Sequence, residues 1–489
     1  MEAFRKERPP TSEIGRRLRA AYLLEGSVQR IDDRLRVTVQ LVETGTGNHF
    51  WSQAYERQIT DIFFLQSTIA AEVANELAVQ LSPQQQARLQ QAPTTSFEAY
   101  DRYLRGNERL QRYLDHFDSA DIAEAVRLFR EARSLDNNFA LPLLGIARAY
   151  WQQYRWRPEA APEKIDSVKL LIDHVLELAP RLAEGHFAAG TFALLEEGRE
   201  ARAINYLQRA IELRPSFAPA HNQLAMAYRL REEPAKALWH LQRAVLLDPS
   251  KQLPTYYTNT GYVYLGICDF ARAQAYFHKA LEIDSNYRIA IENLLLSWAA
   301  QEQFDSMLPL ARRLQERWPG HSVSLFWLAD TYMELGEYQL ARHYYEALYD
   351  LPGDQQRFHY FDSRHRYSYV LWQLGERGAA REQFERQRTW YLQTVKSAGN
   401  TRQPIRIFTY DLAAIYAFLG QREEALKWLK AFASTGWHWG SPYYIEVDRL
   451  FAPLRADPEF QTVVQEAQKR KAEQRSALKA TSVFVPTLN

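Results

Sequence analysis

The chain has 489 residues, of which 46% are hydrophobic and 24% charged, so it allows several folded domains or one extended repeat array. Its 60 Lys and Arg residues balance its 59 Asp and Glu residues, which disfavours nucleic acid and anionic membranes as partners. The one cysteine, Cys268, excludes an internal disulfide and a thiolate metal cluster, and we expect it to be a packing residue.

The amino-terminal residues predict neither a signal peptide nor a membrane anchor. The opening MEAFRKERPPTSE has no apolar core, and no stretch reaches the roughly 18 consecutive apolar residues that a membrane helix needs. We therefore expect no membrane partner and a cytoplasmic location, or a periplasmic one if the full-length gene carries an upstream membrane segment.

Three strands are expected between Tyr22 and Arg57, after a helix at residues 12–19. The segment RLRVTVQLV has the alternation of a half-buried antiparallel strand, with its apolar residues at Leu35, Val37, Val39 and Leu41. The turn sequences IDD and TGTGN on either side predict a three-stranded antiparallel meander. Gly45 and Gly47 resemble a dinucleotide-binding loop only superficially, because a strand follows them, and we assign them to a hairpin turn.

A helix is expected after the strands, because the apolar residues of the next segment share one helical face: Ile62, Leu65, Ile69, Val73 and Leu77. Asp61 lies at the amino-terminal end of this helix, where the helix dipole favours a negative charge. Strands and helices together predict a small α/β domain at residues 1–92.

The middle of the chain repeats with one period. The small residue that opens a second helix recurs at intervals of 34, 36, 34 and 34 residues, at Ala203, Ala237, Ala273, Met307 and Ala341. The large residue late in each first helix keeps these intervals, at Leu194, Tyr228, Tyr264, Trp298 and Tyr332. The period matches the roughly 34 residues of a tetratricopeptide (TPR) helix-turn-helix unit.

We count about nine such units and predict a mostly α-helical TPR solenoid, a right-handed superhelix, at residues 93–437. Small residues such as Gly261 should let the two helices of a unit cross closely, and proline should end the second helix. Insertions are expected in loops, near residues 107–118, 152–163 and 388–404.

Residues 438–489 are expected to form capping helices and a basic tail, because the last unit of a repeat array needs a cover. Four aromatic residues favour a hydrophobic lid over a ligand cage: Trp437, Trp439, Tyr443 and Tyr444. We expect the basic stretch KRKAEQRSALKA to be a frayed, solvated end rather than a nucleic-acid-binding arm.

The concave surface of such an array is where extended partners usually lie. At about 100° per residue, the side of each first helix opposite its packing residues should line this groove. The predicted groove residues are Asn222, Met226, Arg229, Tyr262, Leu265, Glu292, Leu296, Phe326, Asp330, Met333, Tyr369 and Trp372.

This predicted wall is apolar and aromatic with few charges, so an apolar helix or peptide is the expected partner. TPR domains that hold chaperone tails present Lys and Asn at these positions, whereas here Met226 and Tyr262 follow Asn222, so that carboxylate clamp is absent. The alternative is that these residues pack against an additional helix of the same chain, contributed by the insertions.

No catalytic, cofactor-binding or metal-binding residue is predicted. The sequence lacks a phosphate-binding glycine loop and the HExxH, GxSxG and CxxC motifs, and its 12 histidines have no ligand spacing. Carboxylates lie on segments that also carry Arg and Lys, which is typical of solvated helix faces. We therefore expect a chain that is not an enzyme and needs no cofactor.

The order of the segments EIGRRLRAAYLLEGSV, the strands, and SFEAYDRYLRGNERL resembles a bacterial arrangement. It is similar to the second half of the TolB-amino-terminal-like (FlgO-like) α/β domain, which precedes TPR arrays in class III adenylate/guanylate cyclases and in CadC-like winged-helix transcriptional activators. The resemblance extends to the final LFAPLRADPEF. Its most specific residues are the run from Leu24 to Val28 and the series Trp51, Tyr55, Asp61, Phe63 and Gln66.

In that family further strands precede this half-domain, and often a cyclase or DNA-binding domain precedes those strands. Here Met1 falls just before the expected helix at residues 12–19, so neither activity carries over. The sheet should then have an unpaired edge. A partner strand, self-association or the helix before Tyr22 would cover it, unless the chain is a fragment.

Two functions follow from these patterns. The first is a non-enzymatic protein–protein interaction scaffold, a regulatory or sensory TPR module of bacterial signalling that binds a protein partner in its groove. The second is the detached regulatory portion of an adenylate/guanylate cyclase or winged-helix transcriptional regulator, whose effector domain lies upstream.

Overall fold

The computed structural model describes residues 10–18, 20–78, 92–116, 118–156, 163–248, 252–351, 364–397, 402–434 and 445–480. It forms two compact units, Met1–Ala189 and Gly190–Asn489. The predicted aromatic lid lies outside the described residues.

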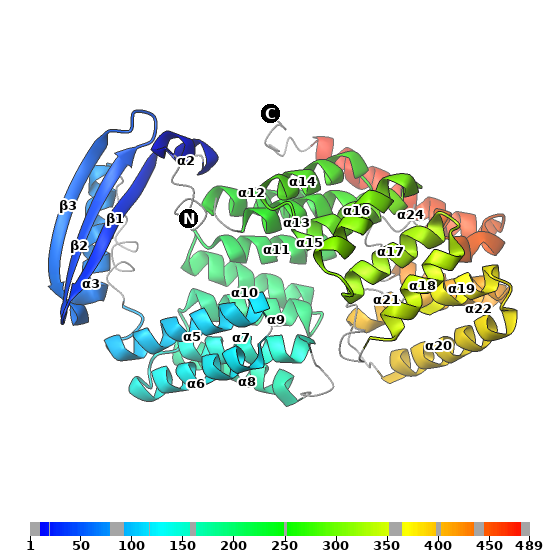
Figure 1. The fold of residues 1–489 in the computed structure, drawn as a ribbon, viewed down its shortest axis with the longest axis horizontal. Coiled ribbons are helices and arrows are strands. Elements are labelled where there is room, and N and C mark those ends of the chain that lie inside the picture. Colours follow the sequence, from blue (N-terminus) through cyan, green and yellow to red (C-terminus); the bar gives the residue numbers. More distant parts are fainter. Residues whose placement is uncertain are drawn as a thin grey trace. The chain divides into compact units, whose positions relative to one another are not determined.

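A three-stranded antiparallel sheet opens the first unit (Figure 1). The strands are neighbours in chain order: β1 (Tyr22–Ile31), β2 (Arg34–Glu43) and β3 (His49–Gln58). The predicted meander is therefore confirmed. Gly47, with a φ of +72°, lies between β2 and β3, as a hairpin turn requires.

One face of the sheet packs against α3 (Ile62–Glu76). Val39, Tyr55 and Leu65 are buried in this small core, and the Tyr55 hydroxyl donates a hydrogen bond to Glu72 at 2.7 Å. Because alternate residues of a strand point to the same face, the alternation of apolar residues in β2 explains why the core is one-sided.

Helix α2 (Thr11–Leu18) is held at the end of β2. The Thr44 hydroxyl donates to the Ala20 carbonyl at 2.7 Å, and a Cβ at Gly15 would clash with the Thr44 side chain. Every residue of β1 except Leu23 is exposed. Helix α2 therefore leaves β1 open.

Successive helix pairs follow, and the described residues contain nine of them. Those that begin in the first unit are α5 (Phe97–His116), α6 (Ser119–Leu135), α7 (Leu141–Trp156), α8 (Glu163–Leu178) and α9 (Ala183–Leu195). Those of the second unit are α10 (Glu200–Leu213), α11 (Ala218–Leu230), α12 (Pro234–Leu247), α13 (Leu253–Gly266), α14 (Phe270–Ile283), α15 (Arg288–Ala299), α16 (Phe304–Arg317), α17 (Ser322–Glu334), α18 (Tyr338–Tyr349), α19 (Arg364–Gln373), α20 (Arg377–Ser397), α21 (Arg402–Phe418) and α22 (Arg422–Ser434).

Two of the expected insertions are helical rather than looped. Residues 107–116 continue α5, and residues 388–397 continue α20. The added turns pack, since Tyr113 of α5 and Tyr391 of α20 are buried. Part of the third expected insertion, residues 157–162, lies outside the described residues.

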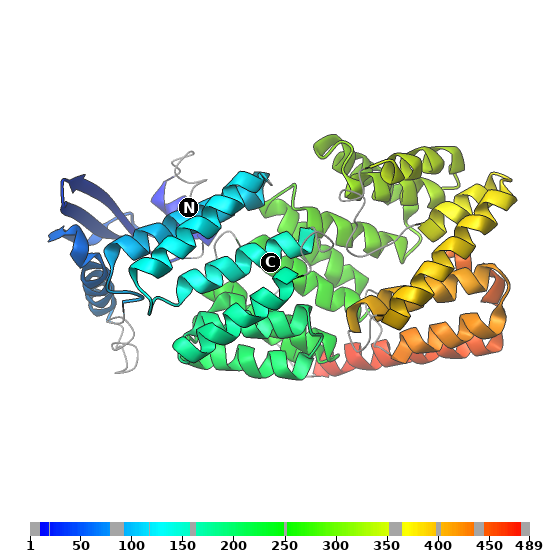
Figure 2. The ribbon, with the colours of Figure 1, turned by 90° about the horizontal axis from the view of Figure 1, so that it is seen from below.

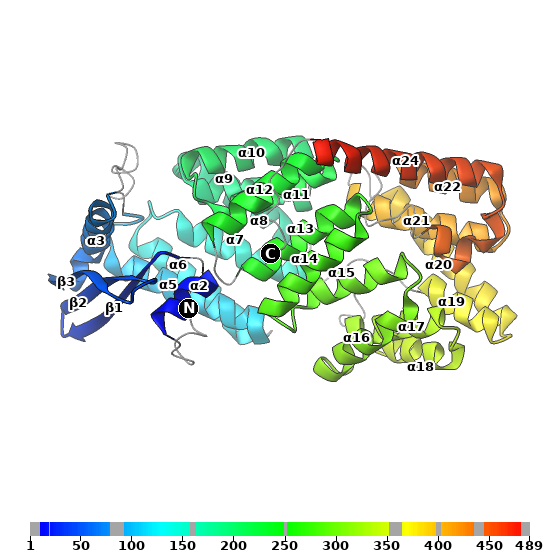
Figure 3. The ribbon, with the colours of Figure 1, turned by 90° about the horizontal axis from the view of Figure 1, so that it is seen from above.

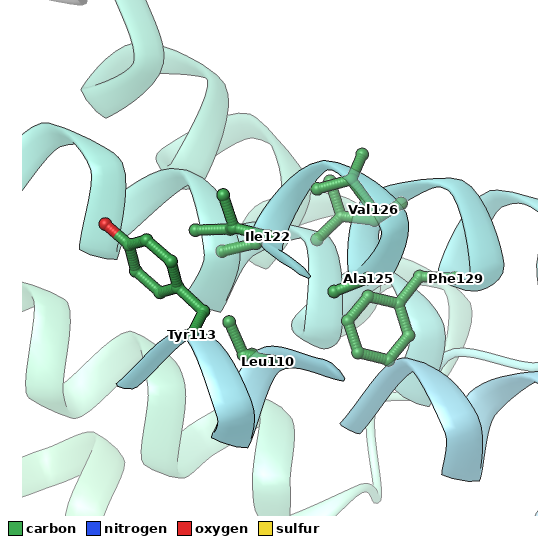
Figure 4. Close-up of a cluster of buried hydrophobic side chains, with 8 residues drawn as sticks. Leu110, Tyr113, Ile122, Ala125, Val126 and Phe129 are labelled. Carbon is green, nitrogen blue, oxygen red and sulfur yellow. The ribbon is translucent and has the colours of Figure 1, made fainter. Parts of the chain in front are cut away.

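The helices of a pair touch through small residues and large apolar ones. Figure 4 shows the contact of α5 with α6, where Leu110, Ile122 and Phe129 gather in one buried cluster. A Cβ at Gly261 would lie 2.5 Å from the Phe277 ring, so glycine is required where α13 crosses α14. The predicted small positions are all completely buried: Ala203, Ala237, Ala273, Met307 and Ala341.

Neighbouring pairs are joined by a recurring hydrogen bond to the late tyrosine of a first helix. In the second unit, Gln208 donates to the Tyr228 hydroxyl and Arg312 to the Tyr332 hydroxyl, each at 3.2 Å and across 20 residues. In the first unit, Arg130 donates to the Tyr150 hydroxyl at 2.8 Å with the same separation. The periodic tyrosine thus fills the interface and bonds across it.

The turn inside a pair repeatedly places one residue at positive φ. Glycine occupies this place between α17 and α18, at Gly336 with a φ of +80°. In three consecutive earlier turns the residue is Glu232, Cys268 or Glu302, with φ of +58°, +59° and +56°. A side chain in this conformation costs on the order of 1 kcal/mol.

Candidate interaction surface of the second unit

The predicted groove residues divide into two groups. Those buried in the structure are Asn222, Leu265, Leu296, Phe326, Asp330, Met333 and Tyr369. Those partly exposed are Met226, Arg229, Tyr262, Trp372 and Glu292, whose side chain is only 12% exposed. A buried side chain offers no surface to a partner, so the prediction of an open groove is wrong for the first group.

The chain covers the later part of this groove itself. Every residue of α17 is buried. The short helix η2 (Arg449–Leu454) packs against α21, and its residues Leu450 and Phe451 are buried. An intramolecular cover was the alternative left open by the sequence; Asp448 and Arg449 provide such a contact at the carboxyl-terminal end of α17, and they do not belong to an expected insertion.

Arg366 of α19 joins this C-terminal segment to the repeats. Its buried guanidinium forms ion pairs with Asp330 and Glu334 of α17, the latter at 3.6 Å. It also lies 3.5 Å from the carboxylate of Asp448, and Arg449 donates to Glu334 at 3.0 Å. We call these five residues the Arg366 cluster.

The Arg366 cluster contains three carboxyl groups and two guanidinium groups. Burial raises the pKa of Asp330 and that of Glu334, the latter to about 7, although Arg366 acts in the opposite direction. A buried charge is costly unless it is neutralised. One proton on Glu334 makes the cluster neutral, so this carboxyl group is poised to titrate near neutral pH.

The stability of the second unit should therefore decrease as the pH rises, because Glu334 loses its proton. Its folded pKa of about 7 lies above the ordinary 4.5, so its stabilisation is complete below pH 4.5 and is lost as the pH rises to about 7. Glu334→Gln cannot titrate. Between about pH 5 and pH 8 we expect the wild-type free energy of unfolding in urea to fall by roughly 2–3 kcal/mol relative to this variant.

The control for this prediction is Glu382→Gln, which alters an exposed ion pair with Arg386. Its unfolding free energy should keep a constant difference from the wild type over the same pH range. A constant difference for Glu334→Gln as well would contradict the assignment of a titrating proton to the Arg366 cluster.

Helix α24 (Pro458–Ala480) continues the C-terminal segment and lies beside α22 before it reaches α12 (Figures 2 and 3). Asp457 caps it, because its carboxylate accepts hydrogen bonds from the backbone N–H groups of Glu459 and Phe460 at 2.9 and 3.2 Å. Arg422 of α22 also donates to Asp457, at 3.1 Å. The start of α24 is thus fixed to the last helix pair.

The other half of α24 is fixed to two earlier turns. The ammonium of Lys471, 2% exposed, donates to Glu232 at 3.1 Å, and Arg475 donates to the Ile267 carbonyl at 2.7 Å. Burial lowers the pKa of Lys471. The expectation of a frayed, solvated end is therefore wrong, because the helix continues to Ala480 and Lys471 and Arg475 bind the turns that hold Glu232 and Cys268 at positive φ.

Glu232 and Lys471 should show strong coupling in a double-mutant cycle. Glu232→Gln leaves the Lys471 ammonium buried without its carboxylate, which costs roughly 3–5 kcal/mol. Adding Lys471→Met to it should recover most of this loss. Hydrogen exchange of the α24 amides and urea unfolding would measure both effects.

Glu302→Gln is the matched control, because Glu302 occupies the same turn position and forms no ion pair with any residue that the structure describes. We expect it to leave α24 unchanged. If Glu232→Gln behaves like Glu302→Gln, the ion pair does not hold α24.

The partly exposed portion of the predicted groove lies on α11, α13 and α15. We call Met226, Arg229, Tyr262 and Glu292 the open face. The Arg229 guanidinium stacks on the Tyr262 ring at 4.2 Å, and Glu292 forms an ion pair with Arg288. Burial raises the pKa of Glu292. The open face therefore presents an aromatic ring, a thioether and a cation.

Trp372, the remaining half-exposed residue, belongs to a different environment. Its ring lies 5.4 Å from that of Phe418, and the guanidinium groups of Arg377 and Arg381 lie 5.4 and 5.6 Å from it. These residues come from α19, α20 and α21, so Trp372 is not part of the open face.

The sequence patterns did not predict the charged residues that hold the C-terminal segment. Lys471 carried a detectable signal, because it continues the apolar stripe of Phe460, Val464 and Ala467 at helical spacing. Arg366 and Asp448 carried none, since their pairing joins positions far apart in the chain.

Neither a metal centre nor a membrane span is found in the part of the chain that the structure describes. No group of three or more His, Cys, Asp or Glu side chains there is arranged to hold a metal ion. None of the helices there is long and apolar enough to cross a membrane.

Comparison with known proteins identifies the repeats. The family model described as "Tetratricopeptide repeat" matches residues 183–217, 254–287 and 323–354. Its matches fall on helix pairs α9–α10, α13–α14 and α17–α18. The chain therefore contains tetratricopeptide repeats, as its period predicts.

One curated relative is the protein named "Putative adenylate cyclase 3" of Rhizobium meliloti (strain 1021). It is 29% identical over 138 residues, which cover 28% of this chain and 23% of the relative. The chain thus spans about a quarter of the length of this relative.

Three solved structures resemble the chain in fold alone. TTC0263 of Thermus thermophilus is a thermophilic TPR protein that is 22% identical to this chain. The alignment covers 38% of this chain and 97% of TTC0263, with a TM-score of 0.30. PilW, a type IV pilus biogenesis factor, is 16% identical. The alignment covers 51% of this chain and 96% of PilW, with a TM-score of 0.31. YrrB, a TPR protein with an unusual peptide-binding site, is 18% identical. The alignment covers 43% of this chain and 97% of YrrB, with a TM-score of 0.27.

Proposed function

We propose that the chain is a non-enzymatic protein–protein interaction scaffold, a regulatory or sensory module of bacterial signalling. Its partner is a protein or peptide that lies on the open face, and the module works in the cytoplasm. The observation that supports this most is the split of the groove residues: α17 is buried throughout, whereas Met226, Arg229 and Tyr262 remain half-exposed.

The chemistry of the open face supports a peptide partner. Tetratricopeptide repeats use the groove side of their first helices for extended ligands. Tyrosine and arginine are the residue types that contribute most to protein interfaces, and Met226 adds an adaptable apolar contact. Arg229 already holds the Tyr262 ring in place, so the ring loses little conformational entropy when a ligand packs on it.

Loss of the Tyr262 ring should weaken binding at the open face. Peptides selected from a random phage library on the full chain are the probes, and their affinities are measured with purified variants. We expect Tyr262→Ala to weaken them at least tenfold, about 1.4 kcal/mol, because it removes an aromatic contact.

Trp239→Ala is the control, since Trp239 is an exposed aromatic residue on the second helix of the same pair as Met226. It should leave affinity unchanged, and circular dichroism should show equal helicity for both variants. If the selected peptides bind Tyr262→Ala as tightly as they bind the wild type, the open face is not their binding site.

The second candidate function is the detached regulatory portion of an adenylate/guanylate cyclase or a winged-helix transcriptional regulator. The match to the cyclase-named Rhizobium meliloti protein favours it. In this proposal the sheet of the first unit is half of a TolB-amino-terminal-like domain. An in-frame coding sequence upstream of Met1 that encodes an effector would support it, and an in-frame stop codon there would count against it.

The open strand β1 is proposed as a second contact, with a partner strand or a second copy of the chain. Its exposed apolar residues include Leu24, Val28 and Ile31, and apolar unpaired strands recruit further strands. Val28→Lys should lower the fraction of associated chain in sedimentation velocity at micromolar concentration. An unchanged distribution, or a wild type that is wholly monomeric, would rule out self-association.

A further inference from the structure

The open face contains a guanidinium group that lacks a carboxylate. Arg229 is half-buried, its Nε is fully buried without a hydrogen-bond partner, and its one recorded contact is the stack on Tyr262. Among the described residues no carboxylate lies within ion-pair distance of it. Nearby arginines differ, since Arg231 pairs with Glu233 at 3.1 Å and Arg272 with Asp269 at 3.7 Å.

A half-buried guanidinium is stabilised when an anion binds it. Removing a charge from water is costly unless an opposite charge replaces the lost hydration. Arginine presents a rigid fork of N–H donors that fits a carboxylate, and stacking on an aromatic ring fixes its orientation. Arg229 and Tyr262 meet both conditions before any ligand binds.

The same unit contains an internal example of this recognition. Arg366, also on the first helix of a pair, contacts the carboxylate of Asp448 at 3.5 Å. The residues that follow Asp448 at intervals of two and three, Leu450 and Phe451, are buried. The repeats therefore already hold one segment in which an acidic residue precedes two apolar ones.

We propose that Arg229 binds a carboxylate of an extended acidic peptide, whose next apolar side chains pack on Met226 and Tyr262. This inference rests on the proposed function, because it names the ligand chemistry of the open face. The carboxylate comes either from an internal Asp or Glu side chain or from the free C-terminus of the ligand, and Arg229 is the group that selects for it.

Three synthetic peptides with an amino-terminal fluorophore test the proposal on the full chain by fluorescence anisotropy. The first is Ser-Asp-Ser-Leu-Phe-Ser with an amidated C-terminus, which copies the Asp-X-Leu-Phe spacing of the internal segment. The second has Asn in place of Asp. The third has Asn and a free C-terminal carboxylate, so that the two sources of the carboxylate are compared.

We expect a peptide with a carboxylate to bind roughly tenfold more tightly than the amidated Asn peptide, as a charged hydrogen-bonded pair predicts. Arg229→Gln should abolish this difference, and Arg229→Lys should retain part of it. The control is Arg243→Gln, because Arg243 is exposed on α12 beside Trp239. It should bind all three peptides like the wild type.

The outcomes separate this inference from the proposed function. If Asp and Asn peptides bind equally, or if Arg229→Gln keeps the preference, the carboxylate site is overturned while library-selected peptides still bind the open face. If neither selected nor designed peptides bind the folded full chain, both the proposed function and the carboxylate site are contradicted. If Arg229→Gln does not fold, Arg229→Lys is the test: a reduced preference for the carboxylate peptides supports the site, and an undiminished preference overturns it.

Discussion

The buried ion cluster around Arg366 is the constraint on which the second unit depends. Its guanidinium contacts the carboxylates of Asp330 in α17 and Asp448 in the C-terminal segment, which lie 118 positions apart in the sequence. A buried charge must be paired, so separating the C-terminal segment from α17 and α19 would leave buried charges without their partners. The cluster thus fixes Asp448 and Arg449 against α17 and α19.

Two parts of the groove follow from this arrangement. Around α17 and α19 the first helices are covered by their own chain, and α24 then returns to the turns of α11–α12 and α13–α14. On α11, α13 and α15 the four side chains of the open face remain partly exposed. Binding in a repeat array is usually spread along its groove; the binding surface proposed here is limited to the earlier repeats. The strained turn residues Glu232 and Cys268 are held by contacts with α24.

Local patterns predicted the helices and the sheet, because they report on nearest neighbours. The 34-residue period placed the buried alanines and the late tyrosines, and the alternation from Leu35 to Leu41 placed β2. The same patterns failed at Phe326 and Met333. A helix period identifies a second apolar face but does not tell whether solvent or protein lies against that face. Lys471 was misassigned for the same reason, since a basic residue is buried only when a distant carboxylate meets it.

Hydrogen–deuterium exchange of the full chain, followed by mass spectrometry with and without a bound peptide, tests most directly whether the C-terminal segment is a permanent cover. We predict slow exchange for residues 445–454 and for α17 in the free chain, unchanged when peptide binds, with new protection confined to α11 and α13. Fast exchange of residues 445–454 in the free chain, or their release when peptide binds, would contradict this prediction, because the segment would then be a displaceable ligand.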